Sequence, residues 1–434
     1  MVEIFLWVCP PPALDAWKVV PSTPLYLGTI CKQWREMAWS SAILWKDVAV
    51  QLAPTSAQVS LLRDWLLRAK TMPLSITVYG HDNANLTPEN NTLHALDISM
   101  FKVLLTRSRF WSTFRCSGFL PEFINIFDNE QFPVLKSIQL EHRHPFPSLY
   151  SHYNTPPNAL FAASPQLEHF LLKGYPFSEA VMPLTPLKSI AIFVLSVEDS
   201  MTVFRSYSIL VSARLGSVGS NHFATVIPTS KSPAFKHSTL STLHVSCWLD
   251  TEYLLGSLEL PSLENLHVSA RTTCLSSVVS LVERSRCLLH TLNLDIHYKE
   301  DDDLIAAFKS FPRLSSLRLA WFQAYSFSER SRVGARFLTE KLATMLIPAH
   351  GNGPPLLPNL TCLTWEDDIP EDCQLPLAEA IEQRWHIKAV GNAVTVARLN
   401  SVTFVEQFCN LHLKNVLSTL SQEGMNVKLM RYLV

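Results

Sequence analysis

Residue types that could perform chemistry are present, but their spacing predicts no catalytic or metal site. The chain contains nine cysteines, and no two of them have the Cys-x-x-Cys spacing of zinc sites or the clustering of a disulfide framework. His142, His144 and His152 lie in a proline-rich segment, where a metal would need a further ligand and a rigid frame. We therefore interpret the cysteines as reduced, mostly buried thiols and these histidines as surface residues.

The sequence also lacks the motifs of the common nucleotide-binding and hydrolytic sites. Gly216–Ser220 reads Gly-Ser-Val-Gly-Ser, which misplaces the serine for a nucleophile elbow. With 12 glycines in 434 residues, few backbone cradles for phosphate are available. The acidic run Asp301–Asp303 fits a helix N-terminus better than a metal site. We expect no cofactor and no enzymatic activity, although scattered Ser, His and Asp side chains could still converge in space.

Composition and hydropathy indicate which binding partners and which cellular compartment to expect. Lys and Arg (36) balance Asp and Glu (37), so the chain lacks the basic excess typical of nucleic-acid binders. No apolar run reaches the roughly 18 residues needed to span a bilayer. The apolar Met1–Cys9 has no basic n-region and carries Glu3, so it does not resemble a signal peptide closely. We expect a cytoplasmic or nuclear protein that binds neither nucleic acid nor membrane.

The first eighty residues predict short helices followed by strands. An apolar helix over Val2–Cys9 ends at Pro10, and Thr23-Pro24 can begin a helix of about four turns. Apolar residues from Leu27 to Ala38 recur at helical spacing along one face. Alternation then predicts a strand at 48–52, a helix over 55–69 capped by Thr55 or Ser56, and a strand over 73–79.

This N-terminal pattern resembles the F-box of fungal, mushroom-type F-box proteins. The resemblance rests on Glu3-Ile4-Phe5, a proline-rich linker, Leu25-Tyr26-Leu27-Gly28 through Cys31-Lys32-Gln33-Trp34-Arg35 and Ala38, and then Leu44-Trp45. The Leu-Pro-x-Glu turn that opens F-boxes is missing before Glu3, so the resemblance implies an N-terminally truncated module. It further implies a Skp-family adaptor as partner, with these residues forming or supporting the adaptor face: Ile4, Phe5, Leu25, Leu27, Cys31, Trp34 and Trp45. The alternative is that these side chains only cap the domain that follows.

The rest of the chain repeats an irregular Pro-x-Leu-x-x-Leu-x-Leu motif. Several neighbouring copies are separated by the roughly 20–29 residues of leucine-rich repeats, with helix-like segments between them. The copies have these first leucines: Leu135, Leu167, Leu187, Leu240, Leu263, Leu289, Leu314, Leu360 and Leu399. We expect an α/β fold, in which a three-helix F-box-like module precedes a leucine-rich-repeat-like solenoid with a curved parallel sheet and helices on the convex side.

In such strands the last two leucines point into the core, while the residue between them and the residue after them face the open, concave side. This rule gives a mixed set of polar candidates for binding a target protein: Gln139, Glu141, His244, His267, Asn293, Asp295 and Arg318. No copy occurs in 196–238, and we interpret its Ser- and Gly-rich part, from Ser212 through Ser238, as a long loop.

We divide the chain into the module (1–50), a linker or capping segment (51–110) and the solenoid (111–434) with an irregular insert at 196–238. Segments near Trp385 and Leu417 also resemble the closing part of the fungal family. The resemblance implies a substrate-receptor subunit of an SCF-type cullin–RING ubiquitin ligase, which holds the adaptor and a target protein. The alternative is a non-catalytic repeat scaffold that no longer docks to the ligase.

Overall fold

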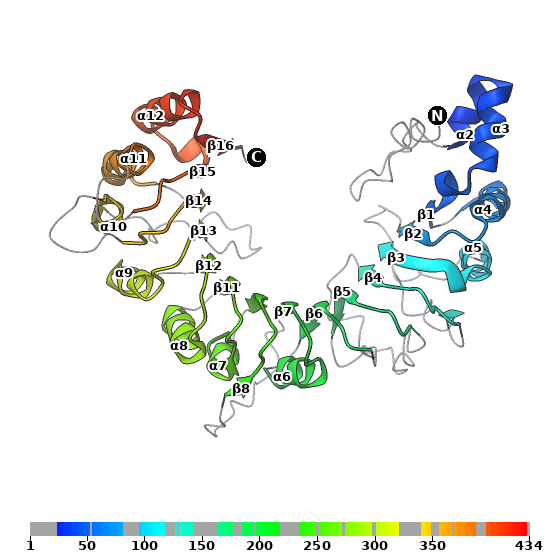
Figure 1. The fold of residues 1–434 in the computed structure, drawn as a ribbon, viewed down its shortest axis with the longest axis horizontal. Coiled ribbons are helices and arrows are strands. Elements are labelled where there is room, and N and C mark those ends of the chain that lie inside the picture. The colour runs from blue at the N-terminus through cyan, green and yellow to red at the C-terminus, as the bar shows by residue number, and fades with distance from the viewer. Residues whose placement is uncertain are drawn as a thin grey trace. The chain divides into compact units, whose positions relative to one another are not determined.

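A computed structural model describes most of the chain, in the following ranges: 24–52, 54–80, 95–117, 126–127, 130–141, 164–176, 185–194, 197–217, 234–247, 251–270, 274–296, 301–320, 340–348, 356–366, 369–387 and 396–431. The chain divides into two compact units, Met1–Leu195 (unit 1) and Ser196–Val434 (unit 2). Each unit is a mixed α/β structure built on parallel strands (Figure 1). Among the described residues, no helix is both long enough and apolar enough to cross a membrane.

Unit 1 has six parallel strands that pair in chain order. The strands are β1 (Asp47–Gln51), β2 (Leu74–Tyr79), β3 (Trp111–Ser117), β4 (Ser137–Glu141), β5 (His169–Pro176) and β6 (Ser189–Val194). The described helices of this unit are α2 (Pro24–Ile30), α3 (Lys32–Ser40), α4 (Ser56–Ala69) and α5 (Ala95–Leu105). A capping box fixes the start of α4, because the side chains of Thr55 and Gln58 each accept a bond from the other's backbone N–H.

Unit 2 continues the same plan with eight strands, most of them separated by a helix. Its sheet comprises β7 (Ser212–Ser217), β9 (Thr242–Cys247), β11 (Asn265–Ala270), β12 (Thr291–Ile296), β13 (Ser316–Ala320), β14 (Cys362–Glu366), β15 (Ser401–Val405) and β16 (Asn426–Met430). Its helices are α6 (Val197–Ser206), α7 (Thr251–Gly256), α8 (Leu275–Ser285), α9 (Asp301–Lys309), α10 (Glu340–Met345), α11 (Glu371–Trp385) and α12 (Leu411–Gln422). Two short strands, β8 (Phe235–Lys236) and β10 (Leu258–Glu259), pair separately.

The leucine copies are neighbouring strands in register, so the predicted α/β fold with a long parallel sheet is confirmed. The middle leucines of four successive copies occupy one cross-strand row: Leu266, Leu292, Leu317 and Leu363. Each is almost fully buried, as are the residues two positions later in the same strands. The first leucine of each copy lies in the turn before its strand and is also buried. The motif therefore supplies three core side chains per copy.

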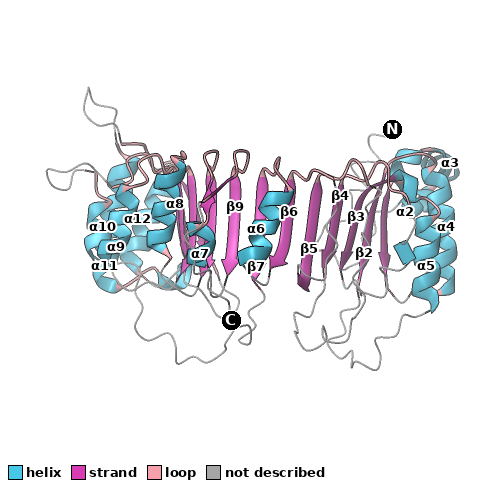
Figure 2. Ribbon diagram, turned by 90° about the horizontal axis from the view of Figure 1, so that it is seen from below, coloured by secondary structure: helices cyan, strands magenta, loops and turns pink. Residues whose placement is uncertain are grey.

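The described helices lie on one side of the strands, with α4 and α5 beside β1 to β3 in unit 1 and α6 to α12 along the strands of unit 2 (Figure 1 and Figure 2). The helical apolar residues predicted from the sequence face the sheet. In α8, Leu275, Val278 and Val282 are buried, and in α9 Leu304 and Phe308 are buried. The acidic residues at the start of α9 lie in its first turn, as expected from the helix dipole. The core thus lies between the helices and the sheet, and the polar strand residues lie on the opposite side, here called the open face.

Two arginines near helix C-termini tie neighbouring helices of unit 2 together. Arg384 in α11 is 1% exposed and donates to the carbonyl oxygens of Leu346, Leu356 and Leu357 at 2.7, 2.6 and 3.1 Å. Burial lowers its pKa to about 10, which still leaves it charged at neutral pH. Arg284 in α8 donates in the same way to the carbonyls of Leu255 in α7 and Leu258 in β10, but is only half-buried. Both side chains donate to backbone carbonyls of neighbouring segments that would otherwise have fewer hydrogen-bond partners.

Unit 1 fills part of its core with aromatic rings. Trp111 is fully buried and stacks on Phe114 with ring centroids 4.9 Å apart. Phe132 and Phe127 pack against the same tryptophan at 5.2 and 6.1 Å. Phe101 of α5 joins the group through Phe127 at 5.8 Å. These rings hold α5 against β3, because aromatic pairs add specific contacts to the area that they bury.

The structure differs from the predicted single helix over the Leu27–Ala38 region. The chain forms two short helices, and Cys31 between them has an extended backbone. Its Sγ accepts a hydrogen bond from the backbone N–H of Trp34 and so caps α3. The close approach of α3 to Gly28 in α2 is fixed by Arg35, whose Nε donates to the Gly28 carbonyl at 2.7 Å. Regular apolar spacing did not reveal this break, because both helices keep apolar residues on compatible faces.

The interpretation of 196–238 as an irregular insert, with Ser212–Ser238 as a long loop, was wrong for its first half. Residues 197–206 form α6, and 212–217 form β7, which pairs in register with β9. Ala213 and Leu215 supply the buried positions of β7. The surrounding Ser and Gly residues hid this short alternation in the sequence. The sheet also begins earlier than residue 111, because β1 and β2 pair in parallel and β2 pairs with β3.

Candidate functional site

The open face of unit 2 carries a continuous row of polar side chains. Parallel register places one residue from each successive strand, β7 through β16, in this row: Arg214, His244, His267, Asn293, Arg318, Thr364, Thr403 and Lys428. The next row toward the strand ends contains Asp295 and Glu366. The register therefore aligns in one row residues that span more than a hundred positions of the chain, as the leucine motif predicted for the four positions after β7.

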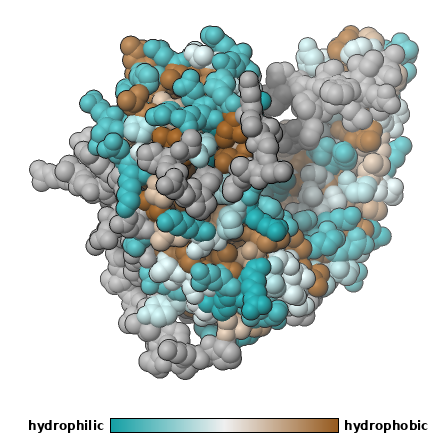
Figure 3. All heavy atoms as spheres, turned by 60° about the vertical axis from the view of Figure 1, so that its left-hand side comes forward, coloured by the Kyte–Doolittle hydropathy of each residue, from teal (hydrophilic) through white to brown (hydrophobic). Residues whose placement is uncertain are grey.

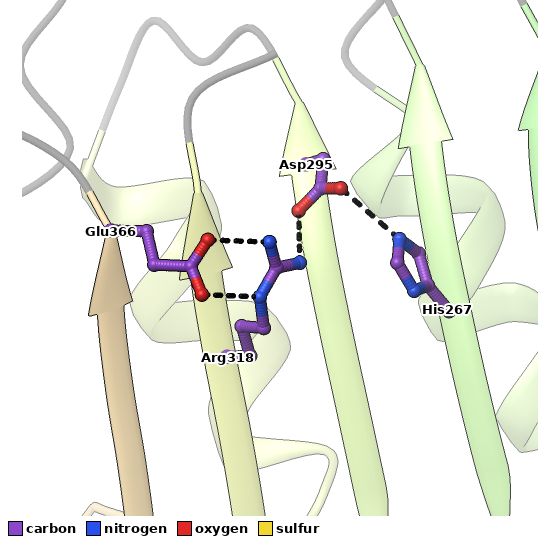
Figure 4. A network of polar contacts seen from close by, with 4 residues as sticks. All are labelled: His267, Asp295, Arg318 and Glu366. Carbon is purple, nitrogen blue, oxygen red and sulfur yellow. Dashed lines mark hydrogen bonds and ion pairs between the residues drawn. The ribbon is translucent and has the colours of Figure 1, made fainter. Parts of the chain in front are cut away.

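Four residues of these rows form a hydrogen-bonded, charged network across β11, β12, β13 and β14 (Figure 4). Arg318 makes a two-pronged contact with Glu366, with Nε–Oε1 at 2.9 Å and Nη2–Oε2 at 2.6 Å. Its Nη1 donates to Asp295 Oδ1 at 2.5 Å. The other Asp295 oxygen lies 3.1 Å from His267 Nε2. We call these four residues, His267, Asp295, Arg318 and Glu366, the open-face network.

The network fixes the ionisation of its members. Burial alone would raise the pKa of Asp295, but the hydrogen bond from His267 and the charge of Arg318 lower it below its ordinary value. The bonds to Glu366 and the charge of Asp295 raise the pKa of Arg318. The side chains of Asp295 and Glu366 are 19% and 17% exposed, so solvent reaches them only in part. Asp295 and Arg318 therefore stay charged at neutral pH while being held in fixed positions.

A stacked pair of imidazoles extends this surface toward β9. The rings of His244 and His267 are nearly parallel, with centroids 3.8 Å apart and an interplanar angle of 9°. Burial, together with the nearby His267 and Arg214, lowers the pKa of His244 to about 3. His244 is therefore neutral at physiological pH. Since the ionised Asp295 can only accept, His267 uses its Nε2–H as the donor toward it.

Unit 1 places the other predicted target-binding residues on its own open face. Gln139 Nε2 donates to Glu141 Oε1 at 2.7 Å, and Lys173 lies 3.9 Å from the other oxygen of Glu141. Glu141 and Lys173 are 30% and 59% exposed, so this ion pair is more solvated than the one in unit 2. All seven predicted open-face residues are thus found on strand faces away from the core. Asn293 lies between His267 and Arg318 in the row.

Glu366 is a member of the network that sequence reasoning missed. It follows Trp365, the third core position of its copy, so it occupies the same place in the motif as Asp295 and Glu141. The rule that picks the residue after the last core side chain would have found it. Its partner Arg318 lies 48 positions away along the chain, which is why only the register reveals the pairing.

The residues that the family resemblance assigns to the adaptor face have different exposures. Leu27 and Trp45 are fully buried, Leu25 and Trp34 are partly exposed, and Cys31 is exposed. Ile4 and Phe5 lie outside the described residues. Trp45 is fixed within unit 1, because its Nε1 donates to the Ala38 carbonyl at 2.7 Å and its ring meets Trp65 edge-on at 4.8 Å. Leu27 and Trp45 therefore support the helices rather than present a surface.

Other large apolar side chains of the first helices are exposed instead. Tyr26 and Ile30 in α2 are 52% and 50% exposed, and Trp39 in α3 is 42% exposed. The guanidinium groups of Arg35 and Arg68 lie 5.8 and 5.1 Å from the Trp39 ring centroid. We call Tyr26, Ile30 and Trp39 the exposed apolar set of α2 and α3. These two short helices thus expose three large apolar side chains, a feature found at protein-binding surfaces.

Other large hydrophobic side chains are exposed on several helices, among them Leu67 in α4, Leu375 in α11 and Leu411 in α12. Figure 3 shows one face of the molecule, on which brown hydrophobic residues reach the surface in groups separated by hydrophilic ones.

Within the described ranges, no cluster of three or more His, Cys, Asp or Glu side chains is placed to hold a metal ion. The histidines at 142, 144 and 152 lie outside those ranges. Burial raises the pKa of the Cys274 thiol to about 12 and that of Cys409 to about 11, which keeps both protonated.

Comparisons with known proteins leave the family of the chain open, since neither the models of protein families nor the curated proteins that were searched give a match.

Proposed function

We propose that this protein is a non-catalytic substrate receptor of an SCF-type cullin–RING ubiquitin ligase. The observation that carries the proposal is the pairing of two features in one chain. One is the F-box-like sequence at α2 and α3, with its exposed apolar set. The other is a parallel sheet whose open face carries ordered polar side chains. A short helical module can hold a Skp-family adaptor, and an open sheet face can hold a target protein.

On this proposal, catalysis is by proximity. The receptor binds the target and the adaptor at the same time and so raises the effective concentration of the target near a ubiquitin-loaded enzyme. No side chain of this chain forms or breaks a covalent bond. Leu27 and Trp45 hold the two helices in position, whereas Leu25 and Trp34 remain partly accessible to the adaptor.

The exposed residues of α2 allow a direct test. The full chain would be co-expressed with a Skp-family adaptor and recovered through a tag on the adaptor. We expect co-purification of the wild type and its loss in Tyr26→Glu and Ile30→Glu, because a charge on a docking surface must be desolvated without a partner. Leu411→Glu is the matched control, since Leu411 is 74% exposed and lies in α12 of unit 2.

A repeat scaffold that does not dock to the ligase is the alternative function. The burial of Leu27 and Trp45 favours it, because these side chains already have intramolecular partners. Failure of the intact, folded chain to retain the adaptor would decide for the scaffold. Retention that both glutamate substitutions leave unchanged would place the adaptor elsewhere.

A further inference from the structure

The open-face network of unit 2 contains more carboxylates than guanidinium groups. It contains one guanidinium, Arg318, between two carboxylates, Asp295 and Glu366. His244, stacked beside the network, stays neutral at physiological pH. The two carboxylates outnumber the single guanidinium on the neighbouring strands β12, β13 and β14. The two carboxylates are held in fixed positions, because the planar guanidinium of Arg318 donates three hydrogen bonds to them.

The network also has more acceptors than donors to offer a partner. Each of the four carboxylate oxygens accepts one bond from within the network. A carboxylate can accept about four hydrogen bonds, so about half of this acceptor capacity remains. Arg318 uses three of its N–H groups in these bonds. A ligand that brings several N–H donors and a positive charge would complement this surface.

The polar side chains that precede the network on these strands are small. Thr291, Ser316 and Thr364 face the same side on β12, β13 and β14, and all are shorter than the arginine. The other cations of the row lie further away. At about 4.8 Å per strand, Arg214 on β7 is about 14 Å from β12, and Lys428 on β16 is about 10 Å from β14. Both of these cations are exposed, so a uniformly basic ligand would be repelled at either side.

We propose that the open-face network is the receptor for a single basic side chain, arginine or lysine, in an extended segment of the target protein. The inference rests on the proposed function, since it names the chemistry of the target that the receptor holds. Asp295 and Glu366 accept the hydrogen bonds of the incoming cation, and Arg318 keeps the two carboxylates apart and aligned. Arg214 and Lys428 select for acidic or neutral residues on either side of that cation.

A peptide library tests this assignment. The immobilised full chain would be presented with pools of twelve-residue degenerate peptides whose central position is fixed as Arg, Lys, Glu, phosphoserine or Ala. We expect the Arg and Lys pools to bind roughly fivefold or more above the Ala pool, as for a partly desolvated ion pair of about 1 kcal/mol. The Glu366→Gln and Asp295→Asn variants should lose that preference.

Glu141→Gln is the matched control, because Glu141 occupies the equivalent motif position on the open face of unit 1. It should keep the preference for basic pools. Circular dichroism of each variant would establish that the sheet is retained, and a variant that unfolds would be replaced by Glu366→Ser. Equal binding of all pools, absence of binding, or a preference unchanged in the folded network variants would overturn the inference. Selection of the Glu or phosphoserine pool would also overturn it.

The outcomes separate this inference from the proposed function. Adaptor recovery depends on α2 and α3, whereas peptide selection depends on β11 to β14. A chain that retains the adaptor but does not select basic peptides keeps the proposed function and loses the inference. A chain that selects basic peptides but does not retain the adaptor is a scaffold with this recognition site.

Discussion

The open faces of the two units are built on the same strand motif but have different electrostatics. In unit 1, Glu141 contacts Gln139 and a largely exposed Lys173. In unit 2, Glu366 occupies the same motif position, but it is paired with an arginine that also binds Asp295. The repeated backbone provides equivalent positions, and the choice of side chain decides whether a position is a solvated pair or part of an ordered network. A polar residue on an open face is therefore informative only together with its cross-strand neighbours.

The cores of the two units differ as well. Unit 1 packs an aromatic group around Trp111, whereas unit 2 places Trp365 between the aliphatic and aromatic neighbours Leu319 and Phe404 of the adjacent strands. Both tryptophans are 0–1% exposed, and each has an indole N–H without a hydrogen-bond partner among the described residues. The free-energy cost of burying the indole N–H is therefore similar for the two tryptophans. A difference in stability between their alanine variants then reports the contribution of ring packing.

The largest expected effect is the loss of Trp111. Replacing it with alanine should lower the free energy of unfolding by about 4 kcal/mol, through lost burial and the cavity that remains. Trp365→Ala should cost about 3 kcal/mol, because fewer ring pairs are broken. Denaturant unfolding followed by circular dichroism measures both. Equal losses would mean that the aromatic group of unit 1 adds nothing beyond buried area.

The next effect compares the two arginines at helix ends. Arg384→Met should cost about 3 kcal/mol, because the buried carbonyls of Leu346 and Leu356 lose their guanidinium donor, whereas Leu357 keeps a bond from the Leu360 N–H. Arg284→Met should cost about 1 kcal/mol, since water can reach the carbonyls that this half-buried side chain leaves. Thermal or denaturant unfolding of the two variants tests the difference. A larger loss of unfolding free energy in Arg284→Met than in Arg384→Met would contradict this prediction.

A smaller effect sharpens the comparison of the open faces. Glu366→Gln should lower the free energy of unfolding by about 1 kcal/mol, because Arg318 loses a two-pronged ionic partner. Glu141→Gln should change it by less than about 0.5 kcal/mol, as expected for an exposed pair. Raising the salt concentration should reduce the first loss. Identical values for both variants would show that the network has no special stability.

The smallest effect concerns pH. The pKa of His244 is about 3 in the folded chain, below the ordinary value of about 6.5. Between these values the unfolded chain binds a proton that the folded chain does not, so stability falls as the pH drops from about 6.5 toward 3. Between pH 7 and 5 the loss should be under about 1 kcal/mol, after allowance for partial solvent exposure.

His244→Asn removes this titration and should flatten the pH dependence between pH 7 and 5. The imidazole carbon resonances of His244 in the wild type should show no titration above about pH 4. A titration midpoint near pH 6.5 would contradict the burial of this ring against His267.

Much of the fold could be predicted from the sequence, because each leucine copy is a local signal. The spacing of three apolar residues marks a strand together with its preceding turn, and the copy Leu289–Leu294 falls on the turn before β12 and on β12 itself. Prediction failed at β7, where Ala213 replaces a leucine, and at Cys31, where an extended residue interrupts a helical pattern. The motif also located the open-face residues, but the partners of Arg318 depend on register across 23 and 48 residues of chain. Such pairings arise only from the assembled sheet.

The last strand of unit 2 has a consequence for self-association. Among the described strands, β16 pairs with β15 alone, which leaves one row of backbone N–H and C=O groups at the sheet edge without a strand partner. A second molecule adding its own β16 in the antiparallel sense, centred on Lys428, would bring two ammonium groups face to face. Like charges directly opposite each other oppose such pairing, and an edge lysine is a common protection against aggregation. Lys428 thus discourages two molecules from joining edge to edge through β16.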